Sequence, residues 1–212
     1  MNPLDTLKIV VGPLATNCYI LWCELTRESC IIDPGSEGET IIEKVEGLNL
    51  DVAMVLCTHA HFDHIGAASL LRDRFEAKLY IHEADVPYLD TYSRMAKDFG
   101  FASIEIPVPD ITLKDDITLR IGGSKLKVIH TPGHTPGSCS IISEGRVFTG
   151  DTLFSGSMGR WDLPGGSLED LKRSLKRLME LPVDTLVLPG HGPYTTIGRE
   201  KLYNPFVRYI FE

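Results

Sequence analysis

Four apolar runs in this chain end in the same way, and that pattern restricts what the chain can fold into. VAMVLC, LKVIH, RVFTG and TLVLPG are each followed closely by a histidine or an aspartate. Short apolar runs bounded by Gly and Pro predict strands, and the polar residues after them fall in loops. Ligands gather at the carboxyl ends of strands in α/β proteins. If these strands are neighbours in parallel sheets, their polar side chains converge on one edge.

The first of these loops is the densest in metal-binding residue types. In CTHAHFDHIG, residues 57–66, six consecutive residues of a chain with 7 histidines include His59, His61, Asp63 and His64. The later loops add three more groups, His134, Asp151 and His191. Neutral imidazole and carboxylate are ligands for zinc, manganese and iron. Seven such groups exceed what one ion needs, and they suit two ions that share a carboxylate and a water.

Composition restricts the class of protein and its partners. The chain has 212 residues, 43% of them hydrophobic, and it carries a formal net charge of −8, which disfavours nucleic acid or anionic lipid as a partner. It contains neither an apolar run as long as a membrane span nor the pattern of a signal peptide. The five cysteines have no C-x-x-C spacing, which is typical of reduced thiols. A cytoplasmic protein without membrane contact is expected.

Residues 1–212 are predicted to form one domain, because no repeat or linker-like segment interrupts them. Residues 6–35 and 117–150 are rich in β-prone runs, and residues 83–106 are predicted to hold short helices. The clearest helix covers residues 167–181, with Ser167 as its N-cap and Pro182 after its end. Two β-rich stretches, each with helices to cover it, predict two packed sheets with helices outside.

The motifs THAHFDHIGA, TPGHTPGS, GDTLF and LPGHGP, in this order, resemble the metallo-β-lactamase superfamily. GDTLFSGSMGRWDLPGGS is most similar to the glyoxalase II (hydroxyacylglutathione hydrolase) branch, and the resemblance covers nearly the whole chain. It implies an α/β fold, a four-layer αββα sandwich with the site at one edge of its sheets. It also implies an assignment of ligands: His59, His61 and His134 to one ion, Asp63, His64 and His191 to a second, and Asp151 bridging. Zinc is the expected metal, and such sites also accept iron or manganese.

The resemblance implies hydrolysis of a small-molecule thioester such as S-lactoylglutathione. A hydroxide shared by the two ions would attack the carbonyl carbon, and Asp63 would orient it as a catalytic residue. Arg160, Trp161 and Tyr194 are candidate substrate contacts, although an ion pair of Arg160 with Asp162, or packing of Tyr194, explains these residues equally well. Asn17 and Asp33 are expected to shape loops beneath the metals. The protein is expected to be a monomer or a small homo-oligomer.

Other activities of the same superfamily remain open. The C-terminal helical region that supplies basic residues to glutathione in longer glyoxalase II enzymes is expected to be lacking, which leaves the thiol part of the substrate open. One alternative is a persulfide dioxygenase with a single iron on His59, His134 and Asp151. A lactonase or another ester hydrolase is a further alternative. A class B lactamase is disfavoured by His64, because those enzymes often lack a histidine at this position.

Overall fold

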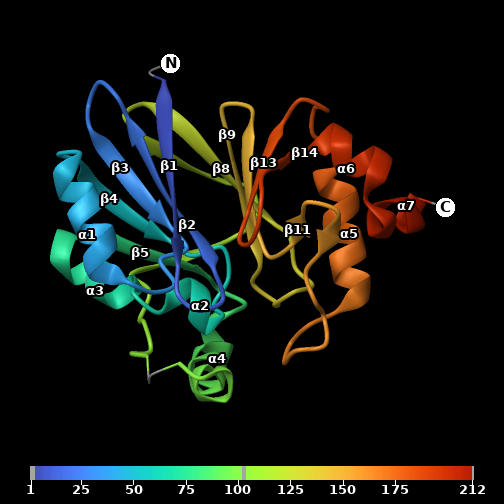
Figure 1. Ribbon diagram of the computed structural model, residues 1–212, viewed down its shortest axis with the longest axis horizontal. Coiled ribbons are helices and arrows are strands. Elements are labelled where there is room, and N and C mark those ends of the chain that lie inside the picture. Colours follow the sequence, from blue (N-terminus) through green and yellow to red (C-terminus); the bar gives the residue numbers. More distant parts are fainter. Residues whose placement is uncertain (1–2, 102–103, 212) are drawn as a thin grey trace.

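The computed structural model describes residues 3–101 and 104–211. Two sheets face each other and helices cover their outer faces, so the predicted four-layer αββα sandwich is confirmed (Figure 1). The first sheet has the strand order β1-β2-β3-β4-β5-β6. Its strands are β1 (Leu4–Val11), β2 (Thr16–Cys23), β3 (Glu28–Ile32), β4 (Asp51–Leu56), β5 (Lys78–His82) and β6 (Ile111–Leu113).

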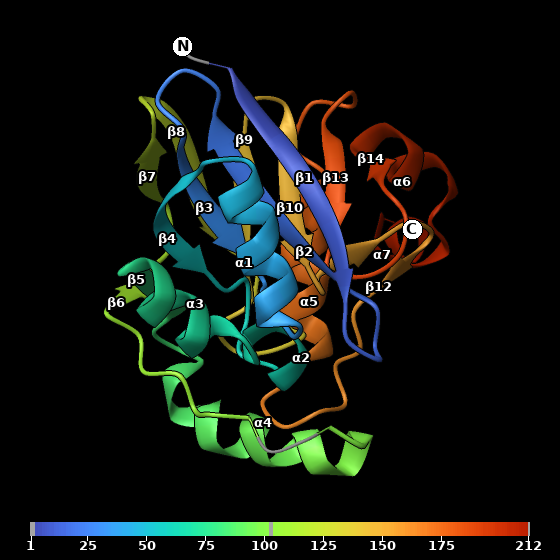
Figure 2. The same cartoon turned by 60° about the vertical axis from the view of Figure 1, so that its left-hand side comes forward.

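The helices that follow the strands of the first sheet lie on its outer side. Figure 2 shows α1 and α3 in front of this sheet, with α4 extending below it. They are α1 (Gly38–Gly47), α2 (Phe62–Ile65), α3 (Ala68–Phe75) and α4 (Leu89–Met95), with 3₁₀ turns at Val86–Tyr88 and Ala96–Phe99. The short helices predicted within residues 83–106 are therefore present.

The second sheet has the order β14-β13-β10-β9-β8-β7. Its strands are β7 (Ile117–Ile121), β8 (Ser124–His130), β9 (Cys139–Ser143), β10 (Arg146–Gly150), β13 (Leu186–Pro189) and β14 (Thr195–Thr196). A separate hairpin pairs β11 (Leu153–Phe154) with β12 (Ser157–Met158). The outer side of the second sheet carries α5 (Leu168–Leu178), α6 (Ile197–Tyr203) and α7 (Pro205–Phe211), visible in orange and red in Figure 1.

The core between the sheets is built from alternate residues of their strands. Tyr19 and Leu21 of β2 meet Phe148 of β10 there, and the rings of Tyr19 and Phe148 pack edge to face at 5.1 Å. All five cysteines are buried, as expected for small apolar side chains. No helix within the described ranges is long and apolar enough to cross a membrane.

The strands that lead to the candidate ligands point toward one edge, but not as an all-parallel sheet. β4 is parallel to its neighbours β3 and β5. In the second sheet β9 is antiparallel to both β8 and β10, and β13 is parallel to β10. The condition that these strands be neighbours in parallel sheets is not met, because β9 separates β8 from β10 and β4 belongs to the other sheet. Because β8, β10 and β13 still run in one direction, their carboxyl ends meet at the same edge.

Helix α5 depends on a cap that also touches a candidate ligand loop. The Ser167 side chain accepts a hydrogen bond from Asp170 N at 3.3 Å, and Ser167 N donates to Gly133 O at 2.8 Å. Replacing such a cap with alanine costs about 1 kcal/mol. We expect Ser167→Ala to lower the free energy of unfolding by about that amount in urea titrations. Ser167→Thr, which keeps the hydroxyl, is the control, and equal losses in both variants would contradict the capping role.

Candidate metal centre

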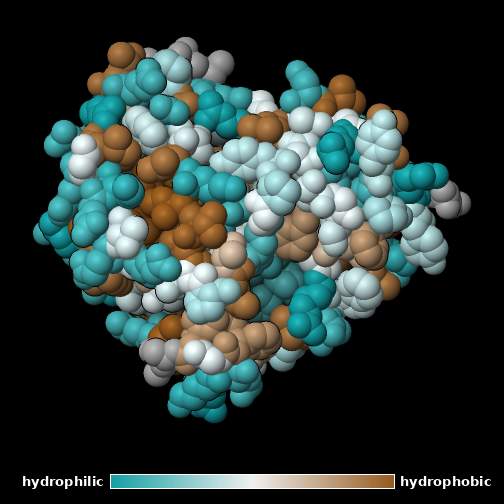
Figure 3. All heavy atoms as spheres, viewed as in Figure 1, coloured by the Kyte–Doolittle hydropathy of each residue, from teal (hydrophilic) through white to brown (hydrophobic). Residues whose placement is uncertain are grey.

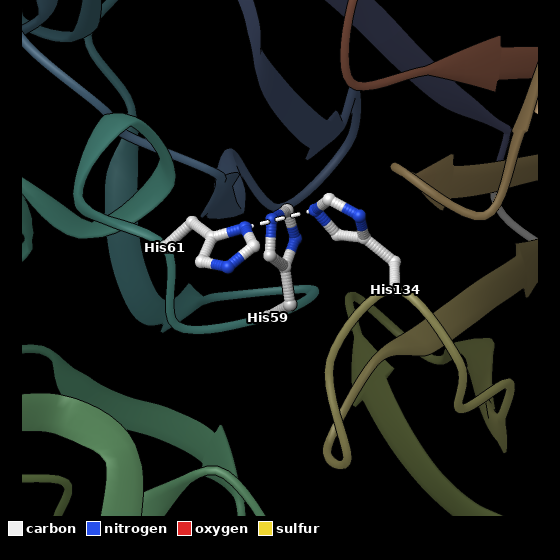
Figure 4. A group of neighbouring side chains, drawn as sticks. All are labelled: His59, His61 and His134. Carbon is white, nitrogen blue, oxygen red and sulfur yellow. Dashed lines mark hydrogen bonds between the residues drawn. The ribbon is translucent and has the colours of Figure 1, made fainter. Parts of the chain in front are cut away.

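All seven predicted ligands meet at the edge where the carboxyl ends of β4, β8, β10 and β13 converge. In three groups the ligand atoms lie within 4.8 Å of one another: His59, His61 and His134; His59, His64 and Asp151; and Asp63, His64 and His191. Figure 4 shows the rings of the first group turned toward one another from the loops after β4 and β8. The second of these groups shares His59 with the first and His64 with the third, and it contains Asp151. Together the three groups form a candidate binuclear site.

Asp151 lies between the two sets of histidines that the resemblance assigns to separate ions. Its Oδ2 is 3.6 Å from Nε2 of His134 and 3.5 Å from Nε2 of His191. Its Oδ1 is 3.4 Å from Nε2 of His64. One carboxylate therefore faces ligands of both sets, which is the geometry that a bridging ligand needs.

In His134, His191 and His59 a protein oxygen lies against Nδ1, and this fixes which nitrogen faces the centre. His134 Nδ1 lies 2.8 Å from Arg160 O, and His191 Nδ1 lies 3.0 Å from Leu14 O. A carbonyl only accepts, so Nδ1 of both rings carries the proton and Nε2 offers a lone pair. His59 Nδ1 lies 3.1 Å from the Thr58 hydroxyl, which donates its own proton to Asp33. The Nε2 lone pair of His59 is likewise free for a metal.

His61 is turned the other way. Its Nδ1 lies 2.8 Å from Nε2 of His134, and the edge of its ring packs against Tyr92 at 4.5 Å between centroids. Nδ1 of His61 and Nε2 of His134 are thus the atoms offered to a shared ion. His59 and His61 therefore offer different nitrogens to the centre. The H-x-H spacing explains this, because the two rings approach the centre from different points of the same loop.

Buried atoms without partners show that the residues fit a metal ion. His59 Nε2 and Asp151 Oδ1 are buried and have no hydrogen-bond partner within residues 3–101 and 104–211. Such atoms are unfavourable in a folded protein unless an ion or water satisfies them. Imidazole nitrogens and carboxylate oxygens are ligands for zinc, iron and manganese. The donor set fits two such ions, and it does not select among them.

The backbone beside Asp151 leaves no room for a side chain. A Cβ added to Gly190 would lie 2.2 Å from Asp151 Oδ1 and 2.7 Å from Cε1 of His64. Glycine at the end of β13 therefore lets the chain pass directly beneath two ligands. The sequence run LPGH, in which Gly190 comes directly before His191, reflects this close approach.

Asp33 supports the loop after β4 from beneath. It is 1% exposed and accepts hydrogen bonds from Thr58 N and Thr58 Oγ1, both at 2.7 Å. Its Oδ2 also lies 3.0 Å from Nδ1 of His64. Asn17 Nδ2 donates to Pro189 O and Gly192 O, on either side of His191. The prediction that Asn17 and Asp33 shape loops is confirmed.

The two sets of histidines differ in their affinity for protons. Burial, together with the neighbouring imidazoles, lowers the pKa values of His59 and His61 well below the usual value. Burial also opposes a proton on His64, but Asp151, Asp63 and Asp33 outweigh it and raise the pKa of His64 to about 10. Burial raises the pKa of Asp63, yet His64 and His191 outweigh it and hold that pKa well below its usual range. Without metal, the second set therefore holds a proton and the first does not.

A cavity of about 220 Å³ opens onto the centre. Five candidate ligands line its floor, namely His61, Asp63, His134, Asp151 and His191, and its walls are Leu14, Phe62, Met95, Phe99, Arg160 and Leu163. Figure 3 shows the hollow between the two halves of the molecule, with hydrophobic side chains gathered over α4 along its lower edge. The sequence patterns did not reveal these apolar walls, because no motif distinguishes them from core residues.

The three predicted substrate contacts lie in different places. Arg160 lines the cavity, and its guanidinium also forms two hydrogen bonds of 2.8 Å with Asp162. Trp161 lines a separate apolar cavity beside α5 and α7. The ring of Tyr194 lies beneath Lys8 Nζ at 4.7 Å and beside Tyr19. Trp161 and Tyr194 are therefore placed away from the cavity that opens onto the candidate metals.

An αββα sandwich with a histidine-rich binuclear site at its edge defines a class of metal-dependent hydrolases. Residues 11–191 match the metallo-beta-lactamase superfamily, and the chain belongs to that superfamily. The hydroxyacylglutathione hydrolase GloC of Haemophilus influenzae is 37% identical to it, over 94% of this chain and 96% of that protein.

Two solved structures are similar over almost their whole length. The B3 metallo-beta-lactamase BLEG-1 has a TM-score of 0.89 and 39% identity, covering 96% of this chain and 99% of that one. TTHA1623 in a di-iron-bound form has a TM-score of 0.86 and 39% identity, covering 94% and 99%. These similarities confirm the resemblance drawn from the motifs.

The difference in proton affinity predicts a difference in the pH dependence of metal binding. An ion bound by Asp63, His64 and His191 must displace the proton on His64, so its affinity should fall about tenfold per pH unit as the pH decreases from 8.0 to 6.5. An ion bound by His59, His61 and His134 displaces no such proton, so its affinity should change little. Zinc titrations of His61→Ala, which keeps the second set, and His191→Ala, which keeps the first, measure the two slopes. Equal slopes would contradict the assignment.

Proposed function

We propose that this metallo-hydrolase cleaves thioesters at a pair of ions held by its seven histidine and aspartate ligands. The observation that carries the proposal is that two ligand sets share Asp151 and face one cavity. Likeness to GloC, named a hydroxyacylglutathione hydrolase, supports a thioester as the substrate. Zinc is the metal proposed first, and likeness to a di-iron structure makes iron the alternative.

Bound ions of this kind polarise a carbonyl oxygen and make water acidic enough to supply hydroxide at neutral pH. The residues of the chain position the reactants. Asp63 lines the cavity, and the Thr16 hydroxyl donates to its Oδ2 at 3.2 Å. Because its pKa lies well below the usual range, Asp63 stays ionised and would accept a hydrogen bond from the attacking water or hydroxide without taking its proton. This orients an oxygen lone pair toward the carbonyl carbon.

The cavity walls describe the part of the substrate that lies next to the metals. Leu14, Met95 and Phe99 present apolar surface to a compact acyl group. Arg160 is the basic residue among the described lining residues, and Asp162 already pairs with it. We propose that the acyl group is recognised by apolar contact, while Arg160 attracts a carboxylate on the thiol part. The thiol leaves as a thiolate without a protein nucleophile.

The first test is hydrolysis of S-lactoylglutathione by metal-free protein reloaded with zinc. We expect activity to return with about two ions per chain. We also expect His64→Ala to lower kcat by at least the roughly 10- to 100-fold that loss of a residue supporting a ligand costs. Wild-type activity in His64→Ala would rule out the two-metal proposal. Oxygen uptake with a persulfide, at one iron per chain, would instead indicate the dioxygenase.

The pairing of Arg160 with Asp162 allows a second test. If Arg160 contacts the thiol part, Arg160→Ala should raise KM for S-lactoylglutathione several-fold and leave kcat unchanged. Asp162→Asn breaks the same ion pair but keeps the guanidinium, so it should lower KM or leave it unchanged. An equal rise of KM in both variants would show that the pair only locks its loop.

β-Lactam hydrolysis is a second candidate, because the similarity to BLEG-1 extends over 96% of this chain. The same zinc-loaded protein should be assayed with a chromogenic cephalosporin. Turnover of the cephalosporin with a higher kcat/KM than the thioester would favour the lactamase reading. The opposite order would favour the thioesterase.

A further inference from the structure

One buried carboxylate beside the centre belongs to neither set of ligands. Asp85 lies in the turn after β5 and is completely buried. It accepts three hydrogen bonds: from Ala60 N at 2.9 Å, from Thr135 Oγ1 at 2.8 Å and from Gly137 N at 2.6 Å. A Cβ on Gly137 would lie 2.5 Å from Cγ of Asp85, so the glycine permits this close approach.

The three donors lie in the two loops that carry the first set of histidines. Ala60 stands between His59 and His61, in the loop after β4 of the first sheet. Thr135 follows His134 directly, in the loop after β8 of the second sheet. A single carboxylate thus joins the two loops whose histidines are drawn in Figure 4, one from each sheet.

Other residues support the second set. His64 lies against Asp33, the Thr16 hydroxyl donates to Asp63, and the Leu14 carbonyl accepts from His191. The order β3-β4-β5 in the sheet explains this division. Asp33 follows β3 and Asp85 follows β5, so they approach the loop after β4 from opposite sides.

Burying the ionised Asp85 carboxylate costs folding free energy, so stabilising the fold does not by itself explain its presence. Burial raises the pKa of Asp85 to about 6, against the lowering effect of its hydrogen bonds with Thr135, Gly137 and Ala60. A carboxyl group with a raised pKa in the folded state favours folding most at low pH. That advantage is lost as the pH rises toward 6, where the group ionises. At neutral pH the chain therefore keeps a carboxylate whose burial opposes folding.

We propose that Asp85 is a positioning residue for the first ion alone: it holds the His59–His61 loop and the His134 loop at the separation that the ion requires. The proposal rests on the two-ion site proposed above, but not on the identity of the substrate. The expected loss of metal affinity when Asp85 is replaced is about 10- to 100-fold, as for other residues that orient metal ligands.

Zinc affinity of metal-free protein tests the proposal without an activity assay. Asp85→Asn is made in two backgrounds: His191→Ala, which keeps the first set, and His61→Ala, which keeps the second. We expect zinc affinity to fall about 10- to 100-fold in the first background and to stay within a factor of about two in the second. Equal losses in both backgrounds, or no loss in the first, would overturn the proposal.

Three further variants keep the test decisive if Asp85→Asn fails to fold. Thr135→Val removes one of the three hydrogen bonds and should weaken zinc binding by the first set only, whereas Thr135→Ser should restore it. Asp115→Asn is the matched control, because Asp115 binds His130 N and Arg177 near the end of β8 without joining the ligand loops. Loss of zinc in Asp115→Asn equal to that in Thr135→Val would also overturn the proposal. Failure of thioester hydrolysis would leave these affinities unaffected.

Discussion

The gathering of five imidazoles and two carboxylates, buried or half-buried, at one edge of the sandwich is the constraint on which this structure depends. His191, His134 and His59 each have a protein oxygen at the nitrogen that does not face the centre, because a buried polar atom without a partner is unfavourable. The chain supplies two of these partners from distant segments, Leu14 O for His191 and Arg160 O for His134, and one from the preceding residue, Thr58 Oγ1 for His59. The tight turns and close glycine contacts around the edge follow from this requirement.

Two buried aspartates divide this work. Asp33 reaches Thr58 and His64, and Asp85 reaches Ala60 and Thr135. They lie on opposite sides of the loop after β4, because β3 and β5 flank β4 in the sheet. The loop that carries most of the ligands is therefore held between two carboxylates. The second sheet is connected to it through Asp85 and through the shared metal site itself.

The cavity above the centre has a different character from its floor. The floor consists of charged and polar ligands, while Leu14, Phe62, Met95, Phe99 and Leu163 supply apolar walls. These residues come from the β1–β2 turn, from α2, from the helices after β5 and from the loop before α5. Apolar walls exclude water from a reaction centre and strengthen the electrostatic interactions within it. The apolar residues that line the cavity thus belong to loops and short helices, which the sheets hold in place.

The sequence alone was sufficient to predict the candidate ligands and the sandwich. H-x-H-x-D-H, together with single His or Asp residues after buried strands, identified all seven groups, because residue type and local spacing carry that information. The Ser167 cap and Pro182 likewise predicted α5. Only the tertiary structure decided which nitrogen of each ring faces the centre and that β9 separates β8 from β10. It also placed Trp161 and Tyr194 away from the cavity and gave Asp85 its partners. A lone aspartate in HEAD has no local signature. Its three donors lie 25, 50 and 52 residues away, and only the packing of two sheets brings them together.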